Sequence, residues 1–279
     1  GFMFNAGDVI FNSLSTAVDL TADELRTSGK WLASAYVPLG RFSYAELLLL
    51  PPQIDPLEYA VDSRLYARGL APAPEAPGSD ETSGGGRLVL RPGGIKLEAG
   101  YLYAGPEAEH RPYLSLQGHL LTDWHLSAAS ALGIEADPAR DFCENLAVSF
   151  GLFHLLKTGY GSTVNLRIEG VMRPEGSWSE NEQASSGASE YGIYLYPEIS
   201  LSPDERRSIF YRAVLSPLDL SAVHMLGGSW NIYQGFKLLG FAGLNSGERG
   251  DRFSWYDSYS GTPNGVPGYF ISAGCEFVF

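Results

Sequence analysis

The sequence predicts an all-β fold, an antiparallel transmembrane β-barrel in which about 13 or 14 strands are visible. Three observations predict it. Apolar and polar side chains alternate along many segments, short and long connections alternate between these segments, and the last segment runs to an aromatic terminal residue. Side chains of a strand point alternately to its two faces, so alternation with period two indicates strands that have one apolar face.

Residues 162–172 give the clearest strand. Three apolar side chains alternate there with three polar ones: Val164, Leu166 and Ile168 against Asn165, Arg167 and Glu169. Two charges and an amide on one inner face would be costly in a dry core, whereas a water-filled lumen solvates them. This strand therefore favours a barrel over a β-sandwich.

The same pattern, sharper in some segments than in others, predicts the remaining strands. Residues 94–104, 206–215 and 268–279 alternate clearly. The other predicted strands cover residues 31–37, 41–50, 86–91, 112–121, 124–134, 143–156, 189–200, 220–230 and 235–244.

The connections alternate in length. Short turns are predicted at residues 38–40, 92–93, 122–123, 157–161, 201–205 and 231–234. Longer connections rich in Gly, Ser and Pro are predicted at residues 51–85, 105–111, 135–142, 173–188 and 245–266. Barrels with brief periplasmic turns and long external loops have this asymmetry, and a Greek-key sandwich has no reason to have it. The link at 216–219 is the exception, because it is short where a long loop is expected.

The last strand carries an apolar residue at every second position up to the final residue. Tyr269, Ile271, Phe277 and Phe279 lie on this face together with Ala273 and Cys275. This ending resembles the carboxy-terminal signature of Gram-negative-type outer-membrane barrels. The resemblance implies a place in the bacterial outer membrane, contact with its lipid bilayer and recognition by the barrel-insertion machinery.

The first fifty residues carry a second, looser resemblance. Asn5-Ala6-Gly7-Asp8 is followed by a hairpin that closes on Leu50-Pro51-Pro52. This resembles a segment of large porin-like barrels, including those similar to alginate-export channels, although Ala6 stands where such loops often carry proline. The resemblance implies a natural barrel of about 16 strands around an aqueous channel, with its N-terminal strand or strands absent here.

The strand count bears on the start of the chain. We expect residues 1–279 to form a single barrel domain, and barrels of this kind usually have an even number of strands. The predicted strands form an odd set, so either residues 2–11 supply a further strand or upstream strands precede Gly1.

Composition excludes several classes of function. The net charge is -13 and the sequence has no basic stripe interleaved with aromatic residues, so we expect no nucleic-acid partner. The longest nearly apolar stretch, 146–156, is too short for a membrane-spanning helix, which needs about 20 apolar residues. Cys143 and Cys275 lie far apart without metal-ligand spacing, and a disulfide between them is an open alternative.

Patterns typical of catalysis or metal binding are weak, and we predict no enzyme, no cofactor and no metal site. The sequence has no Gly-x-Ser-x-Gly elbow and no Walker loop. His119 and His125 flank a turn as a conceivable metal pair, and Ser127 shares a strand face with His125. Both arrangements are more often structural. A loop with acidic and aromatic residues suits sugar stacking or weak cation binding, but a solvated loop explains it more simply: Glu248, Asp251, Trp255, Tyr256, Asp257 and Tyr259.

These observations favour a porin-like channel for passive diffusion of small solutes. We predict as pore-lining residues Lys96, Glu98, Arg167, Glu169, Glu198 and Arg212. Their mixed signs predict a modest ion preference. One alternative is a structural or partner-docking barrel plugged by loops, and another is a hydrophobic-ligand transporter of the fatty-acid type, which the charged inner faces disfavour. A homo-oligomer or a protein partner is left open.

Overall fold

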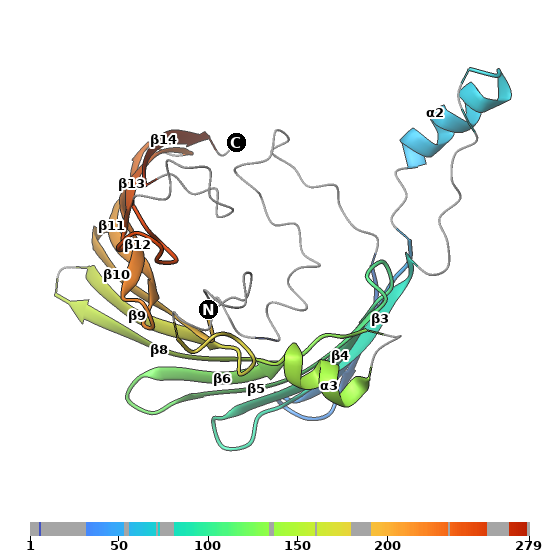
Figure 1. The fold of residues 1–279 in the computed structure, drawn as a ribbon, viewed down its shortest axis with the longest axis horizontal. Helices are drawn as coiled ribbons and strands as arrows, with labels where there is room; N and C mark the ends of the chain where they lie inside the picture. Colours follow the sequence, from blue (N-terminus) through green and yellow to red (C-terminus); the bar gives the residue numbers. More distant parts are fainter. Residues whose placement is uncertain are drawn as a thin grey trace. The chain divides into compact units, whose positions relative to one another are not determined.

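The computed structural model describes residues 6, 32–52, 56–70, 72, 81–133, 137–159, 161–179, 191–233, 235–255 and 268–277. Within these residues the chain forms an all-β fold with one antiparallel sheet of 14 strands (Figure 1). Strand neighbours in the sheet follow the chain order from β1 to β14, except that the short strand β7 pairs with β5. Each strand thus pairs mainly with the strands before and after it.

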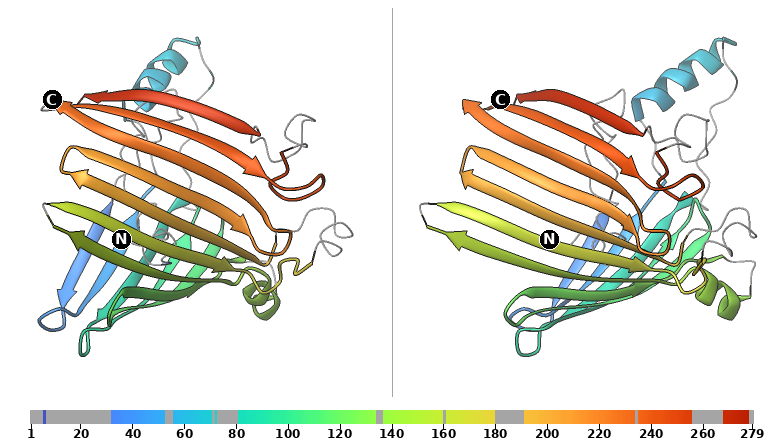
Figure 2. Two further views of the ribbon diagram at one scale, coloured as in Figure 1. Left: turned by 90° about the vertical axis from the view of Figure 1, so that its left-hand side faces the viewer. Right: turned by 60° about the vertical axis from the view of Figure 1, so that its left-hand side comes forward.

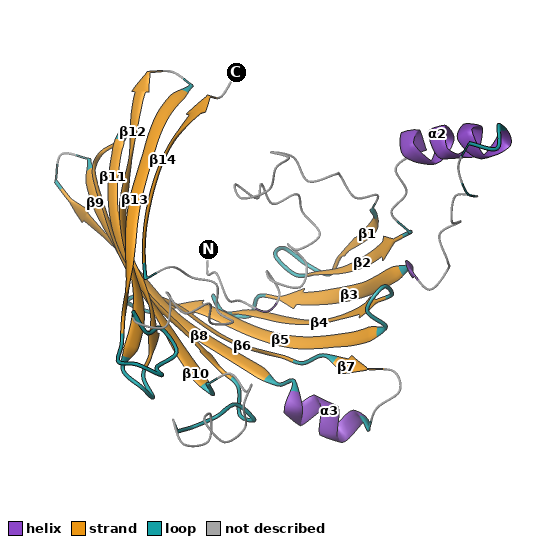
Figure 3. Ribbon diagram, turned by 45° about the horizontal axis from the view of Figure 1, so that its top comes forward, coloured by secondary structure: helices purple, strands orange, loops and turns teal. Residues whose placement is uncertain are grey.

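The first strands are β1 (Ala33–Pro38), β2 (Tyr44–Leu50), β3 (Ser83–Leu90), β4 (Lys96–Ala104), β5 (Glu109–His119), β6 (Asp123–Ala129) and β7 (Leu132–Gly133). The later strands are β8 (Ala147–Thr158), β9 (Ser162–Met172), β10 (Ile193–Asp204), β11 (Arg207–Ser216), β12 (Ser221–Tyr233), β13 (Phe236–Ser246) and β14 (Tyr269–Phe277). Helices α2 (Pro56–Ala67) and α3 (Pro138–Glu144) lie in two of the long connections (Figure 3).

The predicted strands are confirmed, and β9 has the predicted bounds. Several bounds differ. β12 runs to Tyr233, so most of the predicted turn 231–234 is strand. The region 201–205 is mostly strand, because β10 runs to Asp204, and the turn is confined to residues 205–206. The predicted strand 124–134 divides into β6 and β7, and the connection after β4 is only the turn 105–108.

Both helices lie where the sequence predicts loops. The strand predicted from residue 143 begins only at Ala147, because α3 occupies residues 138–144. Asp137 caps α3, since its side chain accepts a hydrogen bond from the Ala139 backbone N–H, and Pro138 suits the first helical turn. In α2 the apolar residues do not gather on one face, so the 3.6-residue period that identifies helices is missing.

The contacts divide the chain into two compact units. Unit 1 comprises Gly1–Asn5, Gln117–Ser127 and Leu146–Phe279, and unit 2 comprises Ala6–Leu116 and Ala128–Asn145. Figure 2 shows the long neighbouring strands β8 to β14 of unit 1 in yellow-green to red. That the chain forms a single barrel domain stays a prediction from the sequence.

In unit 1 the strand register gives the sheet one apolar and one polar face. A row of directly opposed residues on the apolar face runs from β9 to β14: Leu166, Ile199, Tyr211, Leu226, Ala242 and Ile271. The large members of this row are all exposed. The neighbouring row on the polar face contains Arg167, Glu198, Arg212, Met225, Gly243 and Phe270.

Unit 2 has the same two faces. On its apolar face Leu47 opposes Gly86, which opposes Tyr101, and both Leu47 and Tyr101 are exposed. On its polar face Glu46 opposes Arg87, and Val89 opposes Glu98. Apolar residues are thus exposed on one face while charged residues occupy the other.

The sheet is open among the described residues, with β1 and β14 at its edges, and its closure stays a prediction. Except for Ala6, which is helical and buried, the proposed extra strand 2–11 lies outside the described residues. Neither of the two helices in the described ranges has the length and apolar character that a membrane span requires.

Candidate functional site

The polar face of unit 2 holds an ion cluster around Glu98. This carboxylate is 1% exposed, lies 2.6 Å from Lys96 Nζ and 3.4 Å from Arg87 Nη1, and accepts a 2.8 Å hydrogen bond from the Tyr113 hydroxyl. Arg87 also donates to Glu46 at 2.7 Å. Two acids and two bases are thus balanced within one cluster, which makes their burial tolerable.

Gly100 makes room for the tyrosine of this cluster. A Cβ atom at position 100 would lie 2.4 Å from the Tyr113 ring, so the ring occupies the space above the glycine. Because Gly100 lies on the polar face of β4, two residues after Glu98, the ring can cross from β5 and place its hydroxyl on the carboxylate.

On the polar face of unit 1, charges of alternating sign lie on three neighbouring strands. Arg167 of β9 and Arg212 of β11 both stand opposite Glu198 of β10, and Arg212 Nη2 lies 3.5 Å from the Glu198 carboxylate. Each arginine also stacks on an aromatic ring, Arg167 on Phe153 and Arg212 on Phe210. The stacking and the opposite charges hold both guanidinium groups against the strands.

A second buried carboxylate lies beside this charge row. Glu169 is 0% exposed, and its carboxylate lies 3.4 Å from His125 Nε2 and 3.6 Å from Arg167 Nε. Gly151 stands opposite Glu169, and a Cβ there would lie 2.6 Å from the His125 ring. As at Gly100, a glycine lets a ring from a neighbouring strand reach a buried acid.

All six residues predicted to line the pore lie on the polar faces. The structure brings Lys96 and Glu98 together in unit 2, and it brings the other four together in unit 1: Arg167, Glu169, Glu198 and Arg212. Sequence reasoning missed Glu46, Arg87 and Tyr113. The alternation of Arg87 and Val89 with Leu88 and Leu90 is the signal that could have placed Arg87 on the polar face.

The side chains weighed for catalysis and metal binding have structural partners. His119 Nδ1 lies 2.8 Å from Asp123, whereas His125 faces Glu169. The hydroxyl of Ser127 lies 2.6 Å from that of Ser149, and both serines are buried. Among the described residues no group of three His, Cys, Asp or Glu side chains has the geometry to hold a metal ion.

Asp219 organises the connection between β11 and β12. Its side chain accepts hydrogen bonds from the backbone N–H of Arg252 and from both the backbone N–H and the hydroxyl of Ser221. Burial alone would raise the pKa of Asp219, but these hydrogen bonds outweigh it and hold the pKa below its ordinary value. The stabilisation is complete above the ordinary aspartate pKa of about 3.9 and is lost as the pH falls through the lowered pKa.

The predicted acidic and aromatic loop is described only in part. Asp251 accepts a hydrogen bond from the Glu248 backbone N–H and therefore closes a turn of the loop. Trp255 stacks on Tyr269 with 5.8 Å between ring centroids. Tyr256, Asp257 and Tyr259 lie outside the described residues.

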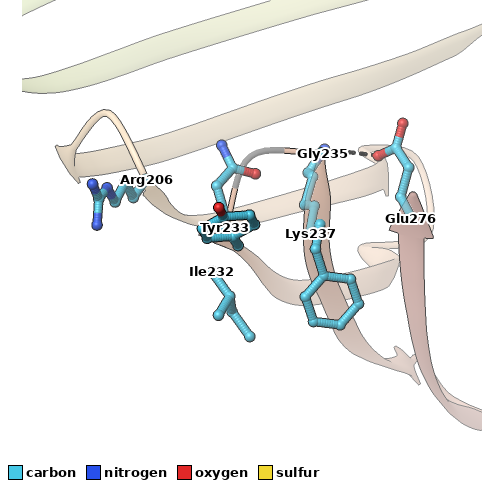
Figure 4. Close-up of a pocket in the computed structure, with 8 residues that line it drawn as sticks. Arg206, Ile232, Tyr233, Gly235, Lys237 and Glu276 are labelled. Atoms are coloured by element: carbon cyan, nitrogen blue, oxygen red, sulfur yellow. Dashed lines mark hydrogen bonds and ion pairs between the residues drawn. The ribbon is translucent and has the colours of Figure 1, made fainter. Parts of the chain in front are cut away.

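An open hollow of about 760 Å³ lies in unit 1 where short turns join the strands (Figure 4). In its lining, Lys237 Nζ lies 3.4 Å from the carboxylate of Glu276, its partner on the neighbouring strand. It is lined by Arg206, Asn231, Ile232, Tyr233, Gly235, Phe236, Lys237 and Glu276. The lining mixes both charges with aromatic rings and provides no cluster typical of a metal or phosphate site.

The described part of the terminal strand keeps the predicted alternation. Tyr269 and Ile271 are exposed on the apolar face of β14, and the Phe277 backbone pairs with Phe236. Phe279 lies outside the described residues. Cys143 and Cys275 are both free and exposed, so the structure contains no disulfide between them.

A comparison of the sequence with protein-family models, with curated proteins and, by structure, with solved structures finds no significant match.

Proposed function

We propose that this chain belongs to an outer-membrane β-barrel that forms a porin-like channel for small solutes. The apolar faces would contact lipid, and the polar faces would line an aqueous lumen whose width and charge select the solutes. Closure of the sheet into a barrel, the outer-membrane location and the channel activity are all parts of this proposal.

The distribution of exposure over the two faces carries the proposal. Leu47 is 62% exposed, Ile199 is 51% exposed and Ile271 is 81% exposed, while Glu98 and Glu169 are almost completely buried on the opposite faces. A water-soluble protein rarely exposes so extended an apolar surface. In a membrane the same surface is satisfied by lipid, and charged residues belong on the side that faces water.

The two free cysteines allow a direct test of the apolar face. Cys275 lies on the same apolar face of β14 as Ile271 and Tyr269, whereas Cys143 lies on α3 between β7 and β8. In intact membranes we expect a membrane-impermeant maleimide to label Cys143 and to leave Cys275 unlabelled, because lipid would cover the second thiol. After unfolding in urea and detergent, both should be labelled.

The single variants Cys143→Ser and Cys275→Ser identify which thiol reacts. Rapid labelling of Cys275 in folded, membrane-embedded protein would show that the apolar face is accessible to water and would contradict its contact with lipid. A protein that stays monomeric without detergent would contradict the barrel itself.

Channel activity is tested by conductance in planar bilayers. We expect steady ohmic openings, and we expect Arg212→Ala to shift the reversal potential in a salt gradient toward cation preference. One unit charge at about 8 Å in water contributes about 0.5 kcal/mol, which is about a twofold change in local ion concentration. Removing both Arg167 and Glu169 should likewise change conductance or ion preference.

Arg207→Ala is the matched control for Arg212. Arg207 lies on the same strand, but its side chain stacks over Trp230 on the apolar face. Its replacement removes the same charge and should leave the reversal potential unchanged. A folded barrel that gives no openings, or equal shifts from the two arginine variants, would argue against the proposed lumen.

The plugged barrel is the second candidate, and one observation favours it. Ala6 is buried against Leu48 and Tyr113, which both lie on the polar face of unit 2. A segment packed on that face would occupy part of a lumen. The fatty-acid transporter is disfavoured, because a lumen for apolar ligands would not carry the ion clusters around Glu98 and Glu198.

A further inference from the structure

The loop after β13 crosses the polar face of unit 1. The ring of Phe253 packs edge to face against Tyr194 of β10, with 6.2 Å between the centroids. The strands β11 and β12 separate β10 from β13, which corresponds to a distance of about 14 Å at 4.8 Å per strand. Tyr194 lies four residues before Glu198 on β10, so both side chains lie on the polar face. The loop must therefore pass over this face to reach Tyr194. Figure 2 shows this loop, in dark orange, at the ends of the strands, where it follows β13.

Asp219 fastens the middle of this loop. One carboxylate oxygen of Asp219 accepts a 2.8 Å hydrogen bond from the Arg252 backbone, and the other accepts from Ser221. The Ser221 hydroxyl in turn accepts a hydrogen bond from the Phe253 backbone N–H at 3.2 Å. Asp219 is 8% exposed and Leu220 has a φ of 57°, so the turn keeps a strained backbone beside the buried carboxylate.

The loop is also held at its two ends. A Cβ at Gly247 would lie 2.8 Å from Ser221 Cβ, so the loop leaves β13 in close contact with the start of β12. At the other end Trp255 stacks on Tyr269 of β14, which lies on the apolar face, so the chain leaves the polar face between Phe253 and Trp255. The loop is therefore attached to β10, β12 and β14, as well as to the turn before β12.

We propose that residues 247–253 form a fixed constriction over the polar face at the strand ends and that Asp219 is the positioning residue that holds it there. This inference rests on the proposed channel function, and it identifies the segment that would limit the width of the channel. The loop carries two acids and two bases, Glu248, Arg249, Asp251 and Arg252, so it restricts solutes by size more than by charge.

The first test compares Asp219→Ala with the wild-type protein in planar bilayers and in liposomes swollen by neutral sugars of increasing size. Loss of this attachment should raise single-channel conductance at least about twofold and admit larger sugars, while the reversal potential stays unchanged. Asp204→Ala is the matched control. Asp204 caps the β10–β11 turn by accepting from the Arg206 and Arg207 backbones, and its loss should change neither property.

The second test locates the loop without relying on conductance. In a Cys143→Ser, Cys275→Ser background, Tyr194→Cys with Phe253→Cys should be joined by a short bis-methanethiosulfonate reagent in folded protein. Leu195→Cys with Phe253→Cys should not be joined, because Leu195 lies on the opposite face of β10.

The outcomes separate the two proposals. Cross-linking only at position 194 together with a wider Asp219→Ala channel supports the constriction. A second outcome is cross-linking at position 194 together with a wild-type protein that shows no conductance and an Asp219→Ala variant that conducts. This outcome supports the role of Asp219 and means that the wild-type barrel is plugged rather than open. Absence of the 194–253 cross-link overturns the loop position, and equal conductance of wild type and Asp219→Ala overturns the constriction while leaving the channel proposal intact. If both proteins are folded and silent, the channel proposal and the constriction both fail.

Discussion

Ile168→Arg is expected to prevent or severely weaken insertion of the folded protein into a bilayer. Ile168 lies in the middle of β9 on the apolar face and is 42% exposed. On the surface of a soluble protein, an arginine at such a position changes stability by about 0.5 kcal/mol or less. At the lipid-facing midplane of a barrel it costs about 2–4 kcal/mol.

The free energy of unfolding in lipid vesicles and the heat-modifiable migration of the folded band measure this effect. Asn165→Arg is the matched control, because Asn165 lies three residues away on the polar face of the same strand. Its loss of one hydrogen bond to Ser200 should cost only about 1 kcal/mol. Equal stability of Ile168→Arg and wild type would rule out lipid contact at this face.

Glu98→Ala should give the largest loss of stability among substitutions on the polar faces. It leaves Lys96 and the Tyr113 hydroxyl without the carboxylate that they contact, whereas Arg87 loses this carboxylate but keeps its ion pair with Glu46. Breaking a buried ion pair by removing one partner typically costs about 3–5 kcal/mol. We expect about 3 kcal/mol, because Glu46 still compensates Arg87.

Glu46→Ala is the control for this prediction. Glu46 is more exposed than Glu98, and Arg87 keeps Glu98 when Glu46 is lost, so we expect a cost of about 1 kcal/mol or less. Urea titrations of both variants in the same vesicles compare the two costs. Similar costs for the two glutamates would contradict the central role of Glu98 in the cluster.

The strands could be predicted from the sequence because their two faces differ so strongly. In β9 apolar and polar residues alternate, and this period of two residues alone predicts the bounds of the strand and the face on which each side chain lies. The same alternation placed Lys96, Glu98, Arg167, Glu198 and Arg212 on the polar faces. The apolar and polar rows form because each strand pairs with the next strand along the chain. In a regular series of hairpins these pairs are close in sequence.

The contacts between distant residues could not be predicted in this way. Asp219 belongs to a connection whose length does not fit the pattern, and its partner Arg252 follows it by more than thirty residues. Phe253, which donates to the neighbouring Ser221, is equally distant in sequence. The pairing of Glu169 with His125 depends on a glycine at position 151, whose role appears only when three strands are placed side by side. The helix α3 was missed because a short capped helix has too few turns to show a period.

The paired rows of the sheet also determine where the length of this protein can change during evolution. Inserting or deleting one residue within β9 would exchange Leu166 and Ile168 with Arg167 and Glu169, and the whole strand beyond that point would present the wrong face to each environment. A change of length in a long connection leaves every row in place. Natural relatives of this chain should therefore differ in length almost entirely between strands, and their strands should vary by substitution alone.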